Sequence, residues 1–344
     1  MPARAFISGL SGPVLLREER AFLREADPWG LILFKRNIQD PEQVIALVSS
    51  FRDAVRRHAP VLIDQEGGRV QRLGPPHWPA YPPGAVYGRL FDQDPRVGCD
   101  AARLGARLIA ADLHALGIDV DCLPIADIPV SGADVVIGDR AYGETPHKVA
   151  QIGAAVSAGL LAGGVLPILK HIPGHGRATA DSHHRLPVVE ADRGTLDAAD
   201  FAPFRALREL PMAMTAHIVF TAIDPLAPTT TSPAMIRVIR TAIGFNGLLM
   251  SDDISMGALT GALGARSAAA IAAGCDVVLH CNGDLAEMRE VAGAVPLLAG
   301  PAEQRAEAAL AMRHAPDPID LPAARAAFAN LVDGRMMAAG TSPQ

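Results

Sequence analysis

The sequence lacks the features that mark several classes of protein. Its four cysteines are far apart and form no CxxC pair, which excludes a small disulfide-stapled scaffold and indicates a reducing compartment. The formal net charge is -6, with acids and bases interspersed, so no basic surface exists for nucleic acid. The longest apolar stretch, residues 158–169, is interrupted by glycines and a proline and is shorter than the roughly 18 residues of a membrane span. We therefore expect a soluble, cytoplasmic monomer without nucleic-acid or membrane partners.

What the chain does contain is a regular alternation of short apolar runs and longer amphipathic stretches. The first run, Phe6–Ser8, has no convincing signal-cleavage site after it, so it is read as a strand. The other seven predicted strands are Leu31–Phe34, Val61–Asp64, Val120–Ile125, Leu166–Ile172, Ala213–Phe220, Leu248–Asp252 and Val277–Leu279. The predicted helices include Pro41–Arg57, Arg96–Leu116, Pro146–Leu161, Leu196–Leu210, Pro233–Ala242 and Ala262–Ala273, several of them opened by Asp or Ser caps.

This alternation predicts an α/β fold with a parallel sheet buried on both faces. Polar residues recur at the carboxyl ends of the predicted strands, where a (β/α)₈ barrel keeps its active site. No GxGxxG fingerprint follows the first strand, which disfavours a doubly wound dinucleotide fold. With 344 residues and 49% apolar composition, the chain suits a single TIM-type barrel domain. We expect the barrel over about residues 5–300 and helices packed outside it over about residues 301–338.

The most unusual segment, residues 170–185, places four of the eleven histidines just after a predicted strand. Its Gly, Pro, Thr and Ser content predicts a loop, in which Asp181 to His183 lies on a movable flap. Asp-x-His spacing lets the carboxylate of Asp181 orient the His183 imidazole and stabilise its protonated form. The alternative is a solvated polar loop with incidental histidines, which the segment alone leaves open.

Two further segments end strands in charged side chains. Asp252 and Asp253 follow a very apolar strand, and because adjacent strand residues point to opposite sides, only one of them can face the barrel axis. Such a carboxylate could attack an anomeric carbon, hold a metal or pair with a cation, while Asp253 is expected to cap the next helix or to form a salt bridge. In the segment after the third strand, Asp64 could accept hydrogen bonds from sugar hydroxyls and Arg72 could donate to an oxygen.

Other polar residues near these segments are expected to have structural roles. Glu66 and Arg69 are expected to form an ion pair beneath the site. A lone His217 at a strand end is more often a hydrogen-bonded rim residue than a catalyst.

Taken together, four segments closely resemble glycoside hydrolase family 3, and more narrowly its bacterial single-domain β-N-acetylglucosaminidases of peptidoglycan recycling. The segments are Ile63–Arg72, Lys170–Gly176, Asp181–His183 and Ser251–Met256. The resemblance implies a two-step retaining hydrolase in which Asp252 is the nucleophile and His183, with Asp181 behind it, is the acid/base. It implies sugar binding by Asp64, Arg72, Arg140, Lys170 and His171. It assigns no role to His184.

The resemblance also implies a substrate with a terminal non-reducing β-linked GlcNAc, expected to be a muropeptide fragment. It requires no cofactor and no metal. Chito-oligosaccharides are the competing substrate, and phosphate could replace water as the acceptor. Rival readings are a Schiff-base lyase using Lys170, a metal-dependent hydrolase and a non-catalytic sugar-binding barrel.

Overall fold

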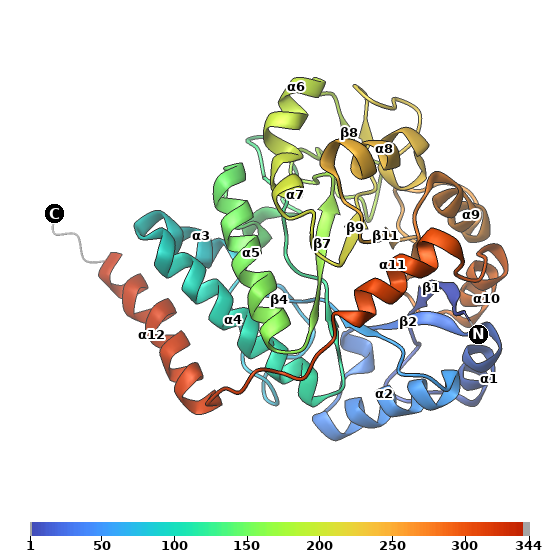
Figure 1. Cartoon of the computed structure of the whole chain (residues 1–344), viewed down its shortest axis with the longest axis horizontal. Coiled ribbons are helices and arrows are strands. Elements are labelled where there is room, and N and C mark those ends of the chain that lie inside the picture. The colour runs from blue at the N-terminus through green and yellow to red at the C-terminus, as the bar shows by residue number, and fades with distance from the viewer. Residues whose placement is uncertain (1, 340–344) are drawn as a thin grey trace.

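The eight predicted strands close into one barrel. The computed structural model describes residues 2–339, with side chains up to residue 332. All neighbouring strands pair in parallel around the ring β1-β2-β3-β6-β7-β9-β11-β12, which confirms the predicted fold class (Figure 1). Their bounds are β1 (Arg4–Ser8), β2 (Pro28–Leu33), β3 (Val61–Ile63), β6 (Val120–Asp121), β7 (Leu166–Ile172), β9 (Met212–Thr215), β11 (Leu248–Asp253) and β12 (Val277–His280).

Helices follow the strands and form the outer ring. They are α1 (Arg17–Ala26), α2 (Pro41–Val55), α3 (Gly84–Gln93), α4 (Pro95–Ala115), α5 (Pro146–Ala162), α6 (Arg193–Thr195), α7 (Ala202–Ala206), α8 (Pro233–Val238), α9 (Leu263–Ala273) and α10 (Leu285–Ala294). The expected caps are present: the side chains of Asp40 and Ser232 accept hydrogen bonds from backbone amides in the first turns of α2 and α8. Proline at the first position of both helices loses no hydrogen bond there.

Two predicted strands are shorter than expected. The strand predicted for Val120–Ile125 ends at Asp121. Beyond it Pro124 has no N–H to donate, and Ile125 forms an isolated bridge with Lys170 of β7. The strand predicted for Ala213–Phe220 ends at Thr215. Its last two residues, β10 (Val219–Phe220), pair instead with β8 (Val188–Val189) in a small sheet outside the barrel. The predicted helix Leu196–Leu210 is likewise broken: a π-helical turn, η3 (Leu196–Asp200), precedes α7.

The remaining elements shape the two ends of the barrel. The end that carries the carboxyl termini of the strands bears a hairpin, β4 (Gln65–Gly67) with β5 (Val70–Gln71), and the short turns η1 (Lys35–Asn37), η2 (Gly138–Arg140) and η4 (Thr229–Thr231). A second π turn, η5 (Ile239–Ile243), extends α8.

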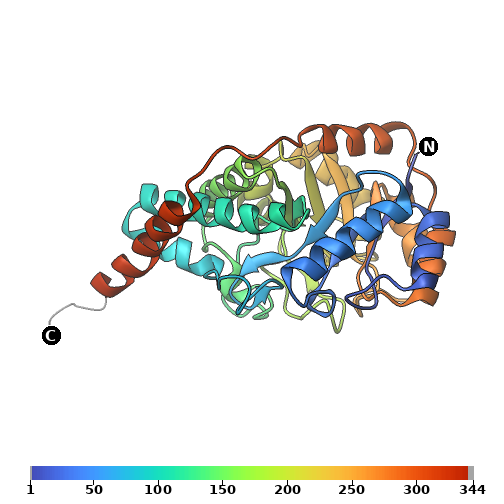
Figure 2. The same cartoon turned by 90° about the horizontal axis from the view of Figure 1, so that it is seen from below.

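Two helices follow the barrel. The first, α11 (Gly300–Ala311), crosses the opposite end of the barrel, where Arg305 donates to Asp276 at 2.9 Å just before β12 (Figure 2). The second, α12 (Leu321–Ala339), packs beside α3 and α4. There Arg325 donates to Asp112 at 2.7 Å. Neither helix covers the end where strand-terminal polar residues gather, so that end is open to a ligand.

Candidate active site

One cavity at the carboxyl ends of the strands gathers every predicted site residue. Its volume is about 290 Å³, at the lower end of the ~300–1,000 Å³ typical of small-ligand pockets. The lining includes Asp64, Arg72, Arg140, Lys170, His171, Asp181, His183 and Asp252, which come from five different loops or strand ends. Residues far apart in the sequence therefore meet here because parallel strands end on the same side of a barrel.

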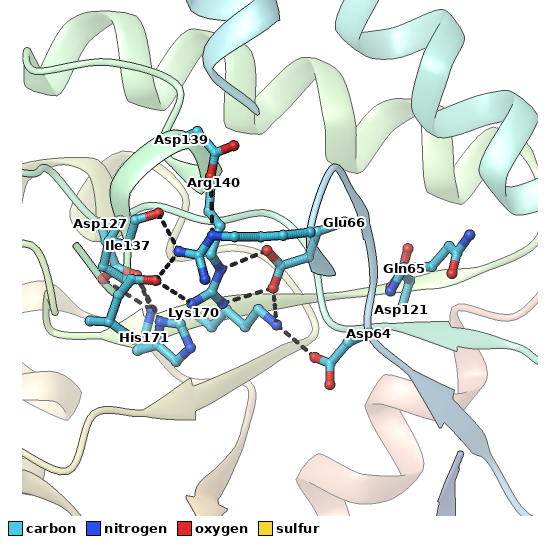
Figure 3. Close-up of polar contacts among 12 residues, drawn as sticks. Asp64, Gln65, Glu66, Asp121, Asp127, Ile137, Asp139, Arg140, Lys170 and His171 are labelled. Atoms are coloured by element: carbon cyan, nitrogen blue, oxygen red, sulfur yellow. Dashed lines mark hydrogen bonds and ion pairs between the residues drawn. The ribbon is translucent and has the colours of Figure 1, made fainter. Parts of the chain in front are cut away.

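A buried ionic network forms one wall of the cavity. The ammonium of Lys170 lies 2.8 Å from Asp64 Oδ1 and 2.7 Å from Glu66 Oε1, and its side chain is only 2% exposed. Arg140 binds Glu66 with two parallel hydrogen bonds of 2.8 Å (Figure 3). Arg72 donates to Asp64 at 2.9 Å. Three cations and two anions leave one excess positive charge, which favours hydroxyl and carbonyl oxygens as ligands.

Charge pairing decides the protonation states in this wall. Burial alone would lower the pKa of Lys170, but Asp64 and Glu66 raise it well above its ordinary value. Burial would likewise raise the pKa of Asp64, but the charges of Lys170 and Arg72 hold it well below its ordinary value. A protonated lysine has no free electron pair, so the network argues against a Schiff-base nucleophile at Lys170.

The role expected for Glu66 was wrong. Glu66 does not pair with Arg69; it bridges Lys170 and Arg140, while Arg69 pairs with Asp139 at 3.2 Å on the surface. The local signal for this was present, because side chains two apart in extended backbone share a face and Glu66 follows Asp64 by two. The intervening Gln65 turns the other way and donates to the carbonyl of Leu73 at 2.8 Å.

Asp252 lies at the end of β11 and reaches the cavity as an ionised carboxylate. Burial acts to raise its pKa, but the charge of His171, the amide of Asp253 and the charge of Lys170 together lower it. Its neighbour Asp253 accepts hydrogen bonds from the backbone and hydroxyl of Ser255. It therefore closes a turn directly after β11, and the expected helix cap was wrong, because the next helix, α9, begins only at Leu263. Among the residues that the structure describes, Asp252 forms no direct ion pair, so its charge is available to a ligand.

His171 is oriented by a residue that sequence reasoning had left without a role. Its Nδ1 lies 2.7 Å from Oδ2 of Asp127, a fully buried carboxylate in the loop after β6. Burial would raise the pKa of Asp127, but His171 and His175 lower it, so the carboxylate stays ionised. The position of Asp127 just after the predicted strand Val120–Ile125 was the only signal for this contact in the sequence. His217 is hydrogen-bonded as expected, to Thr230 and the carbonyl of Asp253.

The loop after β7 carries Asp181 and His183. Asp181 Oδ1 accepts from the backbone N of His183 at 2.9 Å and lies 2.7 Å from its ring Nδ1, which leaves Nε2 available for proton transfer. Partial burial would raise the pKa of Asp181, but these hydrogen bonds lower it. The His183 side chain is 62% exposed, in contrast to the buried wall opposite. His184 is more exposed still, at 83%, and lies 4.0 Å from Asp181.

Residues 14–311 match the glycosyl hydrolase family 3 N terminal domain. The chain belongs to this family. As a family 3 glycoside hydrolase, it is similar to β-hexosaminidases. It is 40% identical over 280 residues to that of Alkalilimnicola ehrlichii, which covers 80% of this chain and 79% of that protein. It is 38% identical over 277 residues to that of Methylococcus capsulatus, which covers 79% and 81%.

The fold is also similar to solved structures of family 3 enzymes. NagZ from Neisseria gonorrhoeae, in complex with N-trifluoroacetyl-D-glucosamine, has a TM-score of 0.86 at 30% identity and covers 96% of this chain and 99% of that one. A family 3 β-N-acetylglucosaminidase from Paenibacillus sp. has a TM-score of 0.81 at 30% identity, covering 90% and 60%. The chain therefore falls in the β-hexosaminidase branch of family 3. Within residues 2–339, no helix combines the length and apolar character needed to cross a membrane.

Proposed function

We propose that the protein is a retaining β-N-acetylglucosaminidase in which Asp252 is the nucleophile and His183, supported by Asp181, is the acid/base. One observation carries the proposal. An ionised strand-end carboxylate and an exposed carboxylate–imidazole pair line the same cavity from two different elements. Retaining hydrolysis requires one group to attack the anomeric carbon and a second to protonate the leaving oxygen.

The mechanism has two balanced steps. Asp252 attacks the anomeric carbon as the glycosidic bond breaks, while protonated His183 gives its Nε2 proton to the leaving oxygen, so that a covalent glycosyl–enzyme ester forms. Neutral His183 then accepts a proton from water, whose oxygen attacks the same carbon and releases Asp252. Two inversions restore the β configuration. Asp181 stabilises the imidazolium and fixes its tautomer, and an imidazole avoids a second anion beside Asp252.

The ionic wall would bind the sugar that is released. Asp64 accepts from hydroxyl groups, while Arg72, Arg140, Lys170 and His171 donate to hydroxyl and N-acetyl oxygens. Asp64 is already paired with Arg72 and Lys170, Arg140 with Glu66, and His171 with Asp127. These groups are therefore held in place before substrate arrives. The aromatic ring of Phe34, 5.2 Å from the Arg72 guanidinium, adds a cation–π contact that restrains that arginine.

For the natural substrate, we favour muropeptide fragments, GlcNAc-1,6-anhydroMurNAc-peptides, cleaved during cell-wall recycling. The support is the family resemblance and the likeness to NagZ. A cytoplasmic site for this reaction suits the four free cysteines, and we treat the chain as one monomeric catalytic domain. Chito-oligosaccharides are the alternative. Rates on purified anhydro-muropeptide and on chitobiose at equal concentration would decide between them.

Phosphorolysis is the alternative reaction at the same residues, since phosphate could attack the glycosyl–enzyme in place of water. The extra positive charge of the ionic wall is the feature that favours it. Turnover in phosphate buffer with product analysis separates the two: GlcNAc indicates hydrolysis, and GlcNAc 1-phosphate indicates phosphorolysis.

The test of the mechanism is release of nitrophenol from 4-nitrophenyl β-N-acetylglucosaminide. Asp252→Ala should abolish it and His183→Ala should reduce it strongly. The matched controls are His184→Ala, a neighbouring exposed histidine, and Asp53→Ala on the surface of α2, and both should retain wild-type rates. The β-glucoside should not be cleaved. Full activity of Asp252→Ala would overturn the assignment.

A further inference from the structure

Two polar side chains at the base of the acid/base loop are buried but have no part in the reaction as described so far. His175 is 3% exposed and Ser182, which lies between Asp181 and His183, is 2% exposed. Ring Nε2 of His175 lies 3.0 Å from the hydroxyl oxygen of Ser182. Buried polar groups are nearly always hydrogen-bonded, and here the hydrogen bond links Ser182, between the two residues of the acid/base pair, to His175.

His175 joins the loop to the sugar-binding side. Its backbone N donates to Oδ1 of Asp127 at 2.6 Å, and the same carboxylate orients His171. The rings of His175 and His171 meet edge to face, with centroids 5.6 Å apart. The contact with Ser182 therefore connects the loop that carries the acid/base to the rigid wall that holds the sugar.

The ring of His175 is neutral at neutral pH. Burial and the charge of His171 lower its pKa to about 4. Among the described residues its Nδ1 has no hydrogen-bond partner. A buried orphan donor is rarer than an orphan acceptor, so the proton is best placed on Nε2, where it is donated to Ser182.

The other side of the loop is tied to the loop that follows β11, the strand that carries Asp252. Gly257 N donates to the carbonyl of His183, and Ala258 N donates to the carbonyl of Ser182, both at 3.1 Å. Any side chain at Gly257 would collide with this arrangement, because a Cβ there would lie 2.8 Å from the His183 oxygen and 3.0 Å from that of His184. Only glycine lets the two loops approach so closely.

We propose that His175, Ser182 and Gly257 are positioning residues that hold the Asp181–His183 pair at the working distance from Asp252. This rests on the proposed function, in which His183 protonates the leaving group. His175 and Ser182 act through a side-chain hydrogen bond, and Gly257 acts through its backbone. None of the three contacts the reacting atoms.

The dependence of the rate on the leaving group distinguishes a positioning role from a merely structural one. Protonation of the leaving oxygen matters most when the leaving group is basic and little when it departs readily as an anion. Displacing His183 should therefore slow the cleavage of poor leaving groups selectively. The ratio kcat/KM reports the first bond-breaking step, so it isolates protonation from the later attack of water.

The experiment measures kcat/KM for 2,4-dinitrophenyl and 4-methoxyphenyl β-N-acetylglucosaminides on Ser182→Ala, His175→Phe and Gly257→Ala. We expect a fall of about ten-fold or more for the methoxyphenyl substrate, because small misplacements of catalytic groups are expensive. The dinitrophenyl substrate should lose less than about two-fold, because it needs little protonation. Equal losses on both substrates, or no loss on either, would overturn the proposal.

Matched controls remove the same groups elsewhere. Ser157→Ala deletes a buried serine hydroxyl that donates to Gly153 O at 2.8 Å in α5, and Gly293→Ala adds a methyl where nothing lies within 4 Å. Both should leave the two rates unchanged. His183→Ala separates the two levels of the argument. If it shows no dependence on the leaving group, the assigned acid/base is wrong; if it does and the three variants do not, only the positioning proposal fails.

Discussion

The two sides of the cavity are built in opposite ways. On the sugar-binding side, Lys170 and Glu66 are 2% and 3% exposed and each is held by more than one charged partner. On the acid/base side, His183 and Asp181 are 62% and 31% exposed, and they are held by contacts within their own loop and by a few bonds to its neighbours. A buried network is rigid and sensitive to the loss of any member, whereas an exposed pair contributes little to stability.

On the sugar-binding side, the residues that bind substrate also stabilise the fold. On the acid/base side, the catalytic residues contribute little to stability. A sugar must be held in one orientation before bond cleavage, which suits a preorganised ionic wall. A proton donor must exchange protons with water in each turnover, which suits partial exposure. Substitutions on the two sides should therefore change activity and the free energy of unfolding differently. Four measurements test that contrast.

The largest effect is expected for Lys170→Met. It leaves Asp64 and Glu66 buried with one fewer cation, and breaking a buried pair in this way costs about 3–5 kcal/mol of unfolding free energy. Activity should be lost as well, since the wall binds the substrate. Urea unfolding and nitrophenol release measure the two effects. An unchanged free energy of unfolding would show that the buried ion pairs of Lys170 do not stabilise the fold.

Asp181→Asn should lower activity with little change in stability. The pair with His183 is substantially exposed, so the unfolding free energy should change by less than about 1 kcal/mol. Turnover should fall by about 10²-fold, because the imidazolium loses its stabilising carboxylate. The same two assays apply. A loss of stability as large as that of Lys170→Met would contradict the contrast between the two sides.

The acid stability of the protein should depend on the wall. The cations lower the pKa of Glu66 from 4.5 to about 2, although burial alone would raise it. Its contribution to stability is therefore fully present above pH 4.5 and is lost as the pH falls toward 2. The slope of unfolding free energy against pH in this window should be shallower in Glu66→Gln. An identical slope would mean that Glu66 is not the group being protonated.

The smallest effect is expected for Arg69→Met. Arg69 and Asp139 are 47% and 50% exposed, and such pairs contribute about 0–1 kcal/mol. Arg140→Met is the matched comparison, because it removes the same type of side chain from the buried Glu66. Thermal unfolding should separate the two by several degrees. Equal melting temperatures would show that burial does not distinguish them.

Much of the fold was predictable because its signals are local. Each barrel strand is an apolar run, and caps such as Asp40 and Ser232 mark the starts of helices. The end of β9 was not predictable. Just beyond that end, the side chains of Thr215 and His217 contact the hydroxyl of Thr230 in a later loop. These contacts depend on residues the local pattern does not contain.

The barrel class and the positions that reach the cavity can be read from local sequence, because strand periodicity and strand-end placement are properties of neighbouring residues. The pairing of the charged side chains cannot. Arg140 binds Glu66, 74 positions earlier, and His171 is oriented by Asp127, 44 positions earlier. The physical reason is that an ion pair is chosen by distance and burial in the folded chain, and the local sequence encodes neither for charges so far apart.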